Sequence, residues 1–192
     1  MNVIALNKDD NKTTLGFWIY LMTDCVLFAS LFATYAVLQG SVYGGVTSRE
    51  IFDMPFVLVE TMILLVSSFT IGLGVLAARH GQKRLAIAWL GITFLLGASF
   101  LGMEIWEFRH LVQEGHSWQS SAFLSAFFTL VGTHGAHIAA GLIWIGVLMT
   151  WLWKRDLDNH AVRKLTLLGL FWHFLDVVWI FIFTIVYLMG VA

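Results

Sequence analysis

The sequence predicts an all-α integral membrane protein, a single domain built as a bundle of five transmembrane helices. Three observations favour this fold class. The 192 residues are 59% hydrophobic and only 12% charged, whereas soluble domains are about 25% charged. Apolar stretches long enough to cross a bilayer, which takes about 20 residues, occur five times. Short polar segments separate these stretches, so no soluble domain is expected.

The expected elements follow one another along the chain with short connections. A polar tail over residues 1–15 precedes the first span, and Pro55 is well placed at the start of the second. The fourth span is long enough to tilt or to project beyond the membrane. The five predicted spans are 16–38, 55–78, 85–107, 122–153 and 165–190.

The distribution of lysine and arginine predicts the orientation of the bundle, because cytoplasmic segments are enriched in these residues. Two, three and four of the eleven fall in segments 1–15, 79–84 and 154–164, which lie on one side of the membrane. Only Arg49 and Arg109 fall on the other side. The N-terminus is therefore expected in the cytoplasm and the C-terminus outside.

Charge and cysteine content exclude several other classes of protein. The formal net charge of −1 gives no basic footprint for nucleic acid. The single cysteine, Cys25, rules out an intrachain disulfide and a cysteine-based metal site.

The last span carries His173 and Asp176 near its middle, three residues apart and so on one face of a helix. A carboxylate at membrane depth costs at least about 2.5–3.5 kcal/mol, so both side chains are expected to face protein. Asp24, in the first span, lies at a similar depth. We therefore predict that Asp24, His173 and Asp176 share one polar cluster in the cytoplasmic half.

Five more polar residues fall inside the predicted spans, namely Glu60, Glu104, Glu107, His134 and His137. The carboxyl groups are expected either to form hydrogen bonds between helices or to be buried in protonated form. All eight intramembrane residues are candidates for a structural role or for contact with lipid, and Asp24 and Asp176 are candidates for proton transfer.

Catalytic and metal-binding patterns are weak. A di-iron carboxylate site needs two Glu-x-x-His pairs, and Glu107 with His110 supplies only one. Haem ligation by the histidines of the last two spans is a further alternative. The chain has no glycine-rich phosphate loop and no serine in a nucleophile elbow. No catalytic residue and no metal or cofactor ligand is therefore assigned.

Three motifs follow one another along the chain. The third span carries the Glu-Ile-Trp-Glu run at 104–107, the fourth carries the His-Gly-Ala-His run at 134–137, and the last reads WHFLDVVW. In this order the motifs resemble subunit III of the haem-copper oxidases. Asp24 stands where cytochrome c oxidase relatives have a glutamate. Mitochondrial members have seven helices with a lipid-filled cleft. This chain has five, and it is most similar to the bacterial cytochrome o ubiquinol oxidases.

The resemblance implies an accessory, non-catalytic subunit of a proton-pumping terminal oxidase in the respiratory chain. In such complexes subunit I holds haem and copper, whereas subunit III packs on subunit I, binds phospholipid, and supports stability and proton uptake. It also implies a multi-pass protein of the bacterial inner membrane. Two alternatives stay open: subunit III of a cytochrome c oxidase, and a stand-alone proton-coupled transporter using Asp24, Glu60 and Asp176.

Overall fold

The fold is seen in a computed structural model, which describes residues 8–40, 54–115 and 118–191. Within these residues every regular element is helical, and five helices are long and apolar enough to span a membrane. The predicted fold class is therefore confirmed. Residues 1–7 of the predicted tail, and the segment 41–53 with Arg49, lie outside the described residues.

The helices extend past several of the predicted spans. Polar residues can continue a helix where water satisfies its terminal backbone groups, whereas a hydropathy count stops at the last apolar residue. Near the C-terminus a π-helical segment interrupts the α-helix, which the sequence did not predict. The elements are α1 (Lys8–Leu38), α3 (Met54–Arg79), α4 (Lys83–Gln113), α5 (Ala122–Lys154), α6 (Asn159–Ile182), the π-helix η1 (Phe183–Leu188) and α7 (Met189–Val191).

Local sequence explains where the helices begin and end. The side chain of Ser121 accepts a hydrogen bond from the backbone N–H of Leu124 at 3.1 Å and caps α5. Asp158 caps α6 in the same way, through the N–H of Ala161 at 2.7 Å. Such caps satisfy backbone donors that the first helical turn leaves unpaired. Gly81 follows the end of α3 with φ +74°, a left-handed conformation that glycine adopts without strain.

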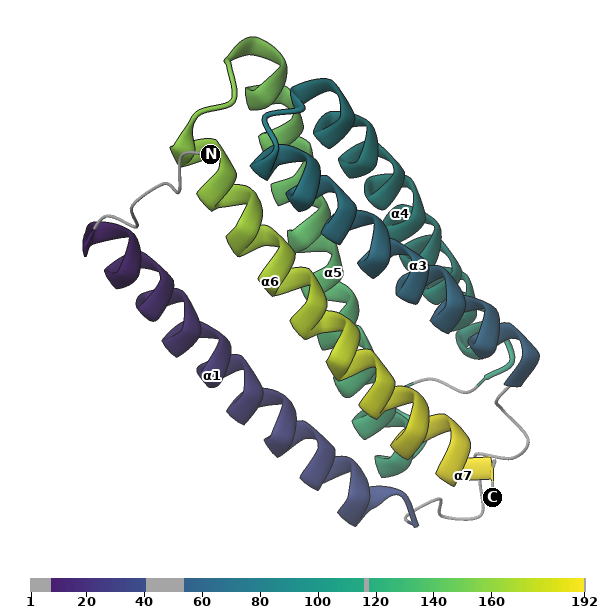
Figure 1. The fold of residues 1–192 in the computed structure, drawn as a ribbon. Coiled ribbons are helices and arrows are strands. Elements are labelled where there is room, and N and C mark those ends of the chain that lie inside the picture. Colours follow the sequence, from purple (N-terminus) through teal and green to yellow (C-terminus); the bar gives the residue numbers. More distant parts are fainter. Residues whose placement is uncertain (1–7, 41–53, 116–117, 192) are drawn as a thin grey trace.

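Figure 1 shows how the connections place the charged segments. The start of α1, the turn between α3 and α4, and the turn between α5 and α6 lie at one end of the bundle. Lys83, at the start of α4, forms a 3.5 Å ion pair with Asp156 in the turn between α5 and α6. Two segments rich in lysine and arginine thus share one end, and the assignment of this end to the cytoplasm stays a prediction.

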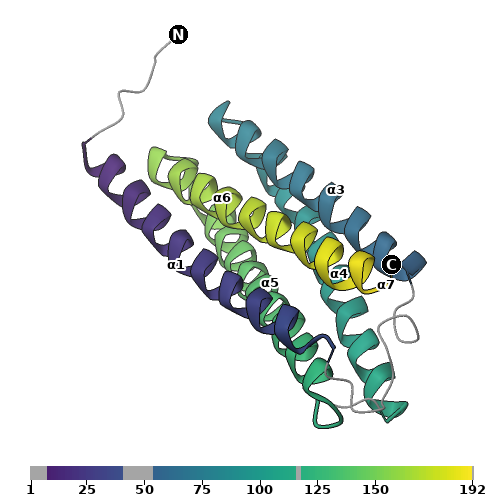
Figure 2. The same ribbon diagram turned by 90° about the horizontal axis from the view of Figure 1, so that it is seen from below.

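Helix α6 lies at the centre of the bundle, between α1 and α3, and its contacts form much of the core (Figures 1 and 2). Trp172 and Trp179 of α6 are fully buried. A Cβ added to Gly97 of α4 or to Gly141 of α5 would lie 2.8 Å or 2.9 Å from the ring of Trp172. Both backbones therefore approach this indole closely, which only small residues permit.

Candidate functional site

The structure buries most of the intramembrane polar residues that the sequence singled out. His137 is half-buried, whereas His173 is exposed on the surface of the bundle. The expectation that His173 faces protein is met only in part, because its Nδ1 contacts Ser68 of α3 while the residue as a whole is exposed on this chain. The buried residues, each exposed by 9% or less, are Asp24, Glu60, Glu104, Glu107, His134 and Asp176.

A histidine–carboxylate contact joins α1 to α5. His137 Nδ1 lies 2.8 Å from the carbonyl oxygen of Thr133. A carbonyl oxygen only accepts, so Nδ1 carries the hydrogen. His137 Nε2 faces Asp24 Oδ2 at 3.8 Å, which is a charge contact rather than a hydrogen bond. The arrangement can hold an imidazolium opposite a carboxylate, or a neutral imidazole opposite a carboxylic acid.

A second polar contact joins α3 to α6. The hydroxyl of Ser68 lies 2.7 Å from His173 Nδ1, and Asp176, one turn along α6, interacts with both residues. Within the described residues no ion pair joins Asp24 to His173. The structure thus gives Asp24 and His173 different partners, rather than the shared cluster that their equal depth predicted. The reason is that α1 packs mainly on α5, while this face of α6 turns toward α3.

A third group lies toward the opposite end of the bundle and contains three carboxyl groups, from Glu60, Glu104 and Glu107. The hydroxyl of Tyr187, in η1, donates a hydrogen bond to Glu107 Oε2 at 3.1 Å. The three carboxyl groups are close enough for their charges to interact. Among the described residues neither oxygen of Glu60, nor Oε2 of Glu104, has a hydrogen-bond partner.

Close packing encloses this acidic group. Gly135 of α5 lies against the carboxyl group of Glu104, and a Cβ at that position would come within 2.9 Å of its Cδ. A buried polar group without a partner is costly, and buried water commonly satisfies such groups. The structure therefore places three carboxyl groups between α3, α4, α5 and η1, and two of them have oxygens without a hydrogen-bond partner among the described residues.

His134 sits beside this group in an aromatic environment. Its ring is fully buried and stacks on Trp179 with centroids 5.3 Å apart. Phe100 meets the same ring edge-on at 6.0 Å. Neither ring nitrogen has a hydrogen-bond partner in the part of the chain that the structure describes. The imidazole here fills the core as an aromatic side chain.

Sequence reasoning missed a row of hydrogen bonds between α3 and α6. The indole N–H of Trp172 donates to Ser67 Oγ, and that of Trp179 donates to Thr61 Oγ1, both at 3.0 Å. The contact of Ser68 with its histidine belongs to the same row. On α3 the hydroxyl residues lie about two turns apart, and on α6 the two tryptophans lie seven residues apart, which is also about two turns. This matching spacing is a pattern that could have predicted the pairing of α3 with α6.

The residues that the structure describes do not bring the candidate metal-binding side chains together. His110, half of the single Glu-x-x-His pair, lies near the end of α4, and its Nδ1 lies 3.5 Å from Glu114 Oε2. Among residues 8–40, 54–115 and 118–191, no three histidine, cysteine or acidic side chains gather in a way that could hold a metal ion.

Within the described residues, five helices long and apolar enough to span a membrane, joined by polar contacts, define a multi-pass membrane protein whose buried acidic groups lie between helices. Comparison with known proteins then gives the family. The chain belongs to the cytochrome c oxidase subunit III family, whose family model matches residues 10–191.

Curated relatives match over nearly the same length. The chain is 62% identical over 179 residues to "Cytochrome bo(3) ubiquinol oxidase subunit 3" of Pseudomonas aeruginosa, covering 93% of this chain and 86% of the relative. It is 51% identical to "Cytochrome c oxidase subunit 3" of Bacillus sp. (strain PS3), with 93% and 86% covered. It is 50% identical to "Quinol oxidase subunit 3" of Bacillus subtilis, with 93% and 87% covered. The resemblance inferred from the motifs is therefore confirmed.

Proposed function

We propose that the chain is an accessory, non-catalytic subunit III of a proton-pumping terminal oxidase that oxidises ubiquinol and reduces oxygen to water. The observation that carries this proposal is the 62% identity, over 93% of the chain, to a relative named as a ubiquinol oxidase subunit. The bacterial relatives support a location in the inner membrane, as part of a complex of several different subunits.

The geometry supports a structural part in such a complex. The polar contacts described above join helices of this chain to one another. Large apolar side chains cover the outside of the bundle, and Val26, Val37 and Phe69 are each exposed by more than 65%. Such surfaces suit lipid or another membrane subunit. In the proposed complex, subunit I packs on part of this surface and holds the haem and copper, while this chain contributes stability, lipid contact and support for proton uptake.

The electron donor is part of the proposal. Ubiquinol is favoured because two Pseudomonas relatives named for ubiquinol oxidation reach 62% and 56% identity, whereas two relatives named for cytochrome c reach 51%. A third relative named for ubiquinol oxidation, of Buchnera aphidicola, is 43% identical. We also propose that the end carrying both basic turns faces the cytoplasm, which places the N-terminus inside and the C-terminus outside.

Purification through an affinity tag on this chain, from native membranes in mild detergent, tests the proposal. We expect haem and copper to co-purify with the tagged chain, and the preparation to oxidise ubiquinol but not reduced cytochrome c. Oxidation of reduced cytochrome c would instead favour the cytochrome c oxidase alternative. Recovery of the chain without any pigmented partner, together with proton flux by the chain alone in liposomes, would favour a transporter.

A further inference from the structure

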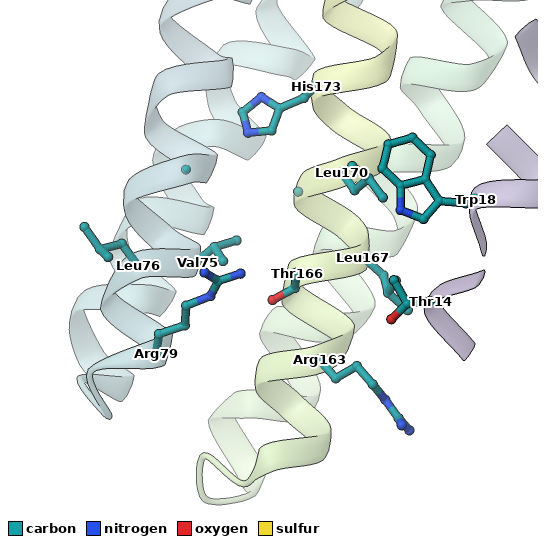
Figure 3. A pocket seen from close by; sticks show the side chains of 12 residues that line it. Thr14, Trp18, Val75, Leu76, Arg79, Arg163, Thr166, Leu167, Leu170 and His173 are labelled. Atoms are coloured by element: carbon teal, nitrogen blue, oxygen red, sulfur yellow. The ribbon is translucent and has the colours of Figure 1, made fainter. Parts of the chain in front are cut away.

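The acidic group of Glu60, Glu104 and Glu107 is enclosed, unlike the groove on the surface of the bundle. Figure 3 shows that groove near the basic turns, where the exposed Arg79 lines it. Glu60 is fully buried, and Glu104 and Glu107 are exposed by only 3% and 8%. Polar groups that bulk solvent does not reach must find their hydrogen-bond partners inside the bundle.

The hydrogen-bond donors around the acidic group are already engaged. The Tyr187 hydroxyl donates to Glu107 Oε2 at 3.1 Å. The Trp179 indole N–H donates to Thr61 Oγ1 at 3.0 Å, and the Thr61 hydroxyl donates in turn to the backbone carbonyl oxygen of Val57 at 2.9 Å. Each of these donors has a single hydrogen, so none is left for another carboxyl oxygen.

Aromatic rings pack beside the acidic group and bring no further donor to it. The Tyr187 ring lies 6.2 Å from the ring of Trp179 and 6.0 Å from that of Phe127, measured between centroids. Phe100 meets Trp179 edge-on at 4.7 Å. His134 stacks on Trp179, but neither of its ring nitrogens reaches a hydrogen-bond partner among the described residues.

Glu60 and Glu104 are left with oxygens that no other described side chain satisfies. In the part of the chain that the structure describes, neither oxygen of Glu60 has a hydrogen-bond partner, and Oε2 of Glu104 has none. The two carboxyl groups are nevertheless near enough for their charges to interact. Polar groups that interact without direct contact are commonly bridged by water, which satisfies both of them.

The bridge requires groups that can both donate and accept. An ionised carboxyl group is costly at membrane depth, and two ionised groups beside each other would repel. Within the described residues no lysine or arginine forms an ion pair with Glu60 or Glu104. A neutral carboxyl group has one O–H donor and keeps its acceptor oxygen, so a water molecule between two such groups can bond to both.

We propose that the acidic group is a water-binding site, in which a water molecule joins Glu60 of α3 to Glu104 of α4 and both carboxyl groups keep their hydrogens. The water accepts the hydrogen of one acid and donates to the carbonyl oxygen of the other. Glu107 accepts from Tyr187 and lies outside this bridge. The site goes beyond the proposed function, because it depends neither on the electron donor nor on where haem is bound.

Radiolytic footprinting of the assembled complex tests for the water. An X-ray pulse converts bound and bulk water into hydroxyl radicals, which oxidise the side chains next to them, and mass spectrometry locates the added oxygen. The fully buried Tyr187 lies close enough to Glu60 and Glu104 to interact with both, so we expect bound water to oxidise it. Trp172 of α6 is equally buried and should stay unmodified. Equal oxidation of Tyr187 and Trp172, or none at Tyr187, would overturn the inference.

Glu60→Met removes one side of the bridge. Oxidation of Tyr187 should then fall to the level of Trp172. The thermal midpoint should stay the same or rise, because the lost hydrogen bonds are offset by removing a buried acid. Glu114→Met is the matched control, since Glu114 follows the end of α4 and half of its side chain is exposed. It should leave the oxidation of Tyr187 unchanged. Oxidation of Tyr187 in Glu60→Met at the level of the unchanged chain would contradict the proposed bridge.

Infrared spectra of the same complex distinguish bound water from a bound cation. Glu60→Gln and Glu104→Gln should each remove a carbonyl stretch of a carboxylic acid, whereas Glu114→Gln should remove none. In the unchanged complex these bands should shift in heavy water, because the acid hydrogens exchange with the bound water. Acid bands that do not shift would identify a dry pair and overturn the inference. Loss of no acid band, with a metal cation retained by the chain, would show that carboxylates bind that cation instead.

Discussion

Replacing Gly97 with alanine should destabilise the bundle through a contact that the structure defines closely. The added Cβ would lie 2.8 Å and 2.9 Å from Cη2 and Cζ2 of Trp172, and 3.0 Å from Cδ2 of Leu142. Trp172 is fully buried and its N–H is bonded to Ser67, so the indole cannot move without losing that hydrogen bond. Overpacking of a core costs about 1–3 kcal/mol.

Part of that cost is offset, because alanine is favoured over glycine in a helix by about 1 kcal/mol. We therefore expect Gly97→Ala to be destabilised by a net of about 0–2 kcal/mol relative to the unchanged chain, and by about 1–3 kcal/mol relative to an alanine placed where it meets no neighbour. By the scaling for chains of this size, the midpoint temperature should fall by up to roughly 8 °C relative to the unchanged chain. The assay is the temperature at which a fluorescently tagged chain is lost from the purified complex in size-exclusion chromatography.

Gly102→Ala is the matched control on the same helix, because a Cβ there would meet nothing within 4 Å. It should leave the midpoint unchanged or slightly raised. Adding Trp172→Phe to Gly97→Ala should cost less than the two separate effects combined, since the smaller ring makes room for the methyl group. If Gly97→Ala is as stable as Gly102→Ala, the packing of α4 on Trp172 is not as the structure shows.

The remaining predictions concern polar groups inside the bundle, and the first of them uses the same thermal assay. Glu60→Met should be neutral or stabilising, because it removes a buried carboxyl group with no partner among the described residues. Thr61→Val, at the next position, leaves the buried indole N–H of Trp179 without its acceptor and should cost about 1–3 kcal/mol of stability. A larger loss of stability in Glu60→Met than in Thr61→Val would contradict this. Asp24→Asn should keep the chain in the complex, because an amide can donate to His137 Nε2 when that nitrogen is unprotonated. Asp24→Leu should lower the recovery of the chain in the purified complex. Equal recovery of the two variants would show that the contact between Asp24 and His137 contributes nothing. Tyr187→Phe should speed backbone hydrogen exchange in η1 by roughly fivefold or more, because it removes the hydrogen bond from Tyr187 to Glu107 of α4. Unchanged exchange would show that this hydrogen bond does not stabilise the π-helix.

The five spans could be predicted from the sequence because a membrane helix needs a long apolar stretch that hydropathy detects directly. The position of the basic segments at one end of the bundle could be predicted as well, because alternate connections between spanning helices must lie on the same side of the membrane. The π-helix at 183–188 could not be predicted, because its residues are as apolar as those of the α-helix before it. Within this segment Tyr187 donates a hydrogen bond to Glu107 of α4, a contact between helices that hydropathy does not specify.

Which helices contact one another could not be predicted from the sequence. Equal depth suggested that Asp24 and His173 meet, but depth alone does not say which helix faces which. The structure pairs Asp24 with His137 across α1 and α5, and His173 with Ser68 across α3 and α6. The burial of Asp176 could be predicted from the cost of a carboxylate in lipid, whereas the identity of its neighbours required the packing of the whole bundle.

In the proposed complex the redox groups belong to another polypeptide, while the polar groups of this chain join its own helices and contact lipid. The most direct test is haem and copper analysis of this chain after its separation from the purified complex. We expect the separated chain to show no haem absorbance and no stoichiometric copper, with both remaining on a partner subunit. A haem or copper ion retained in a one-to-one ratio by this chain would contradict the account.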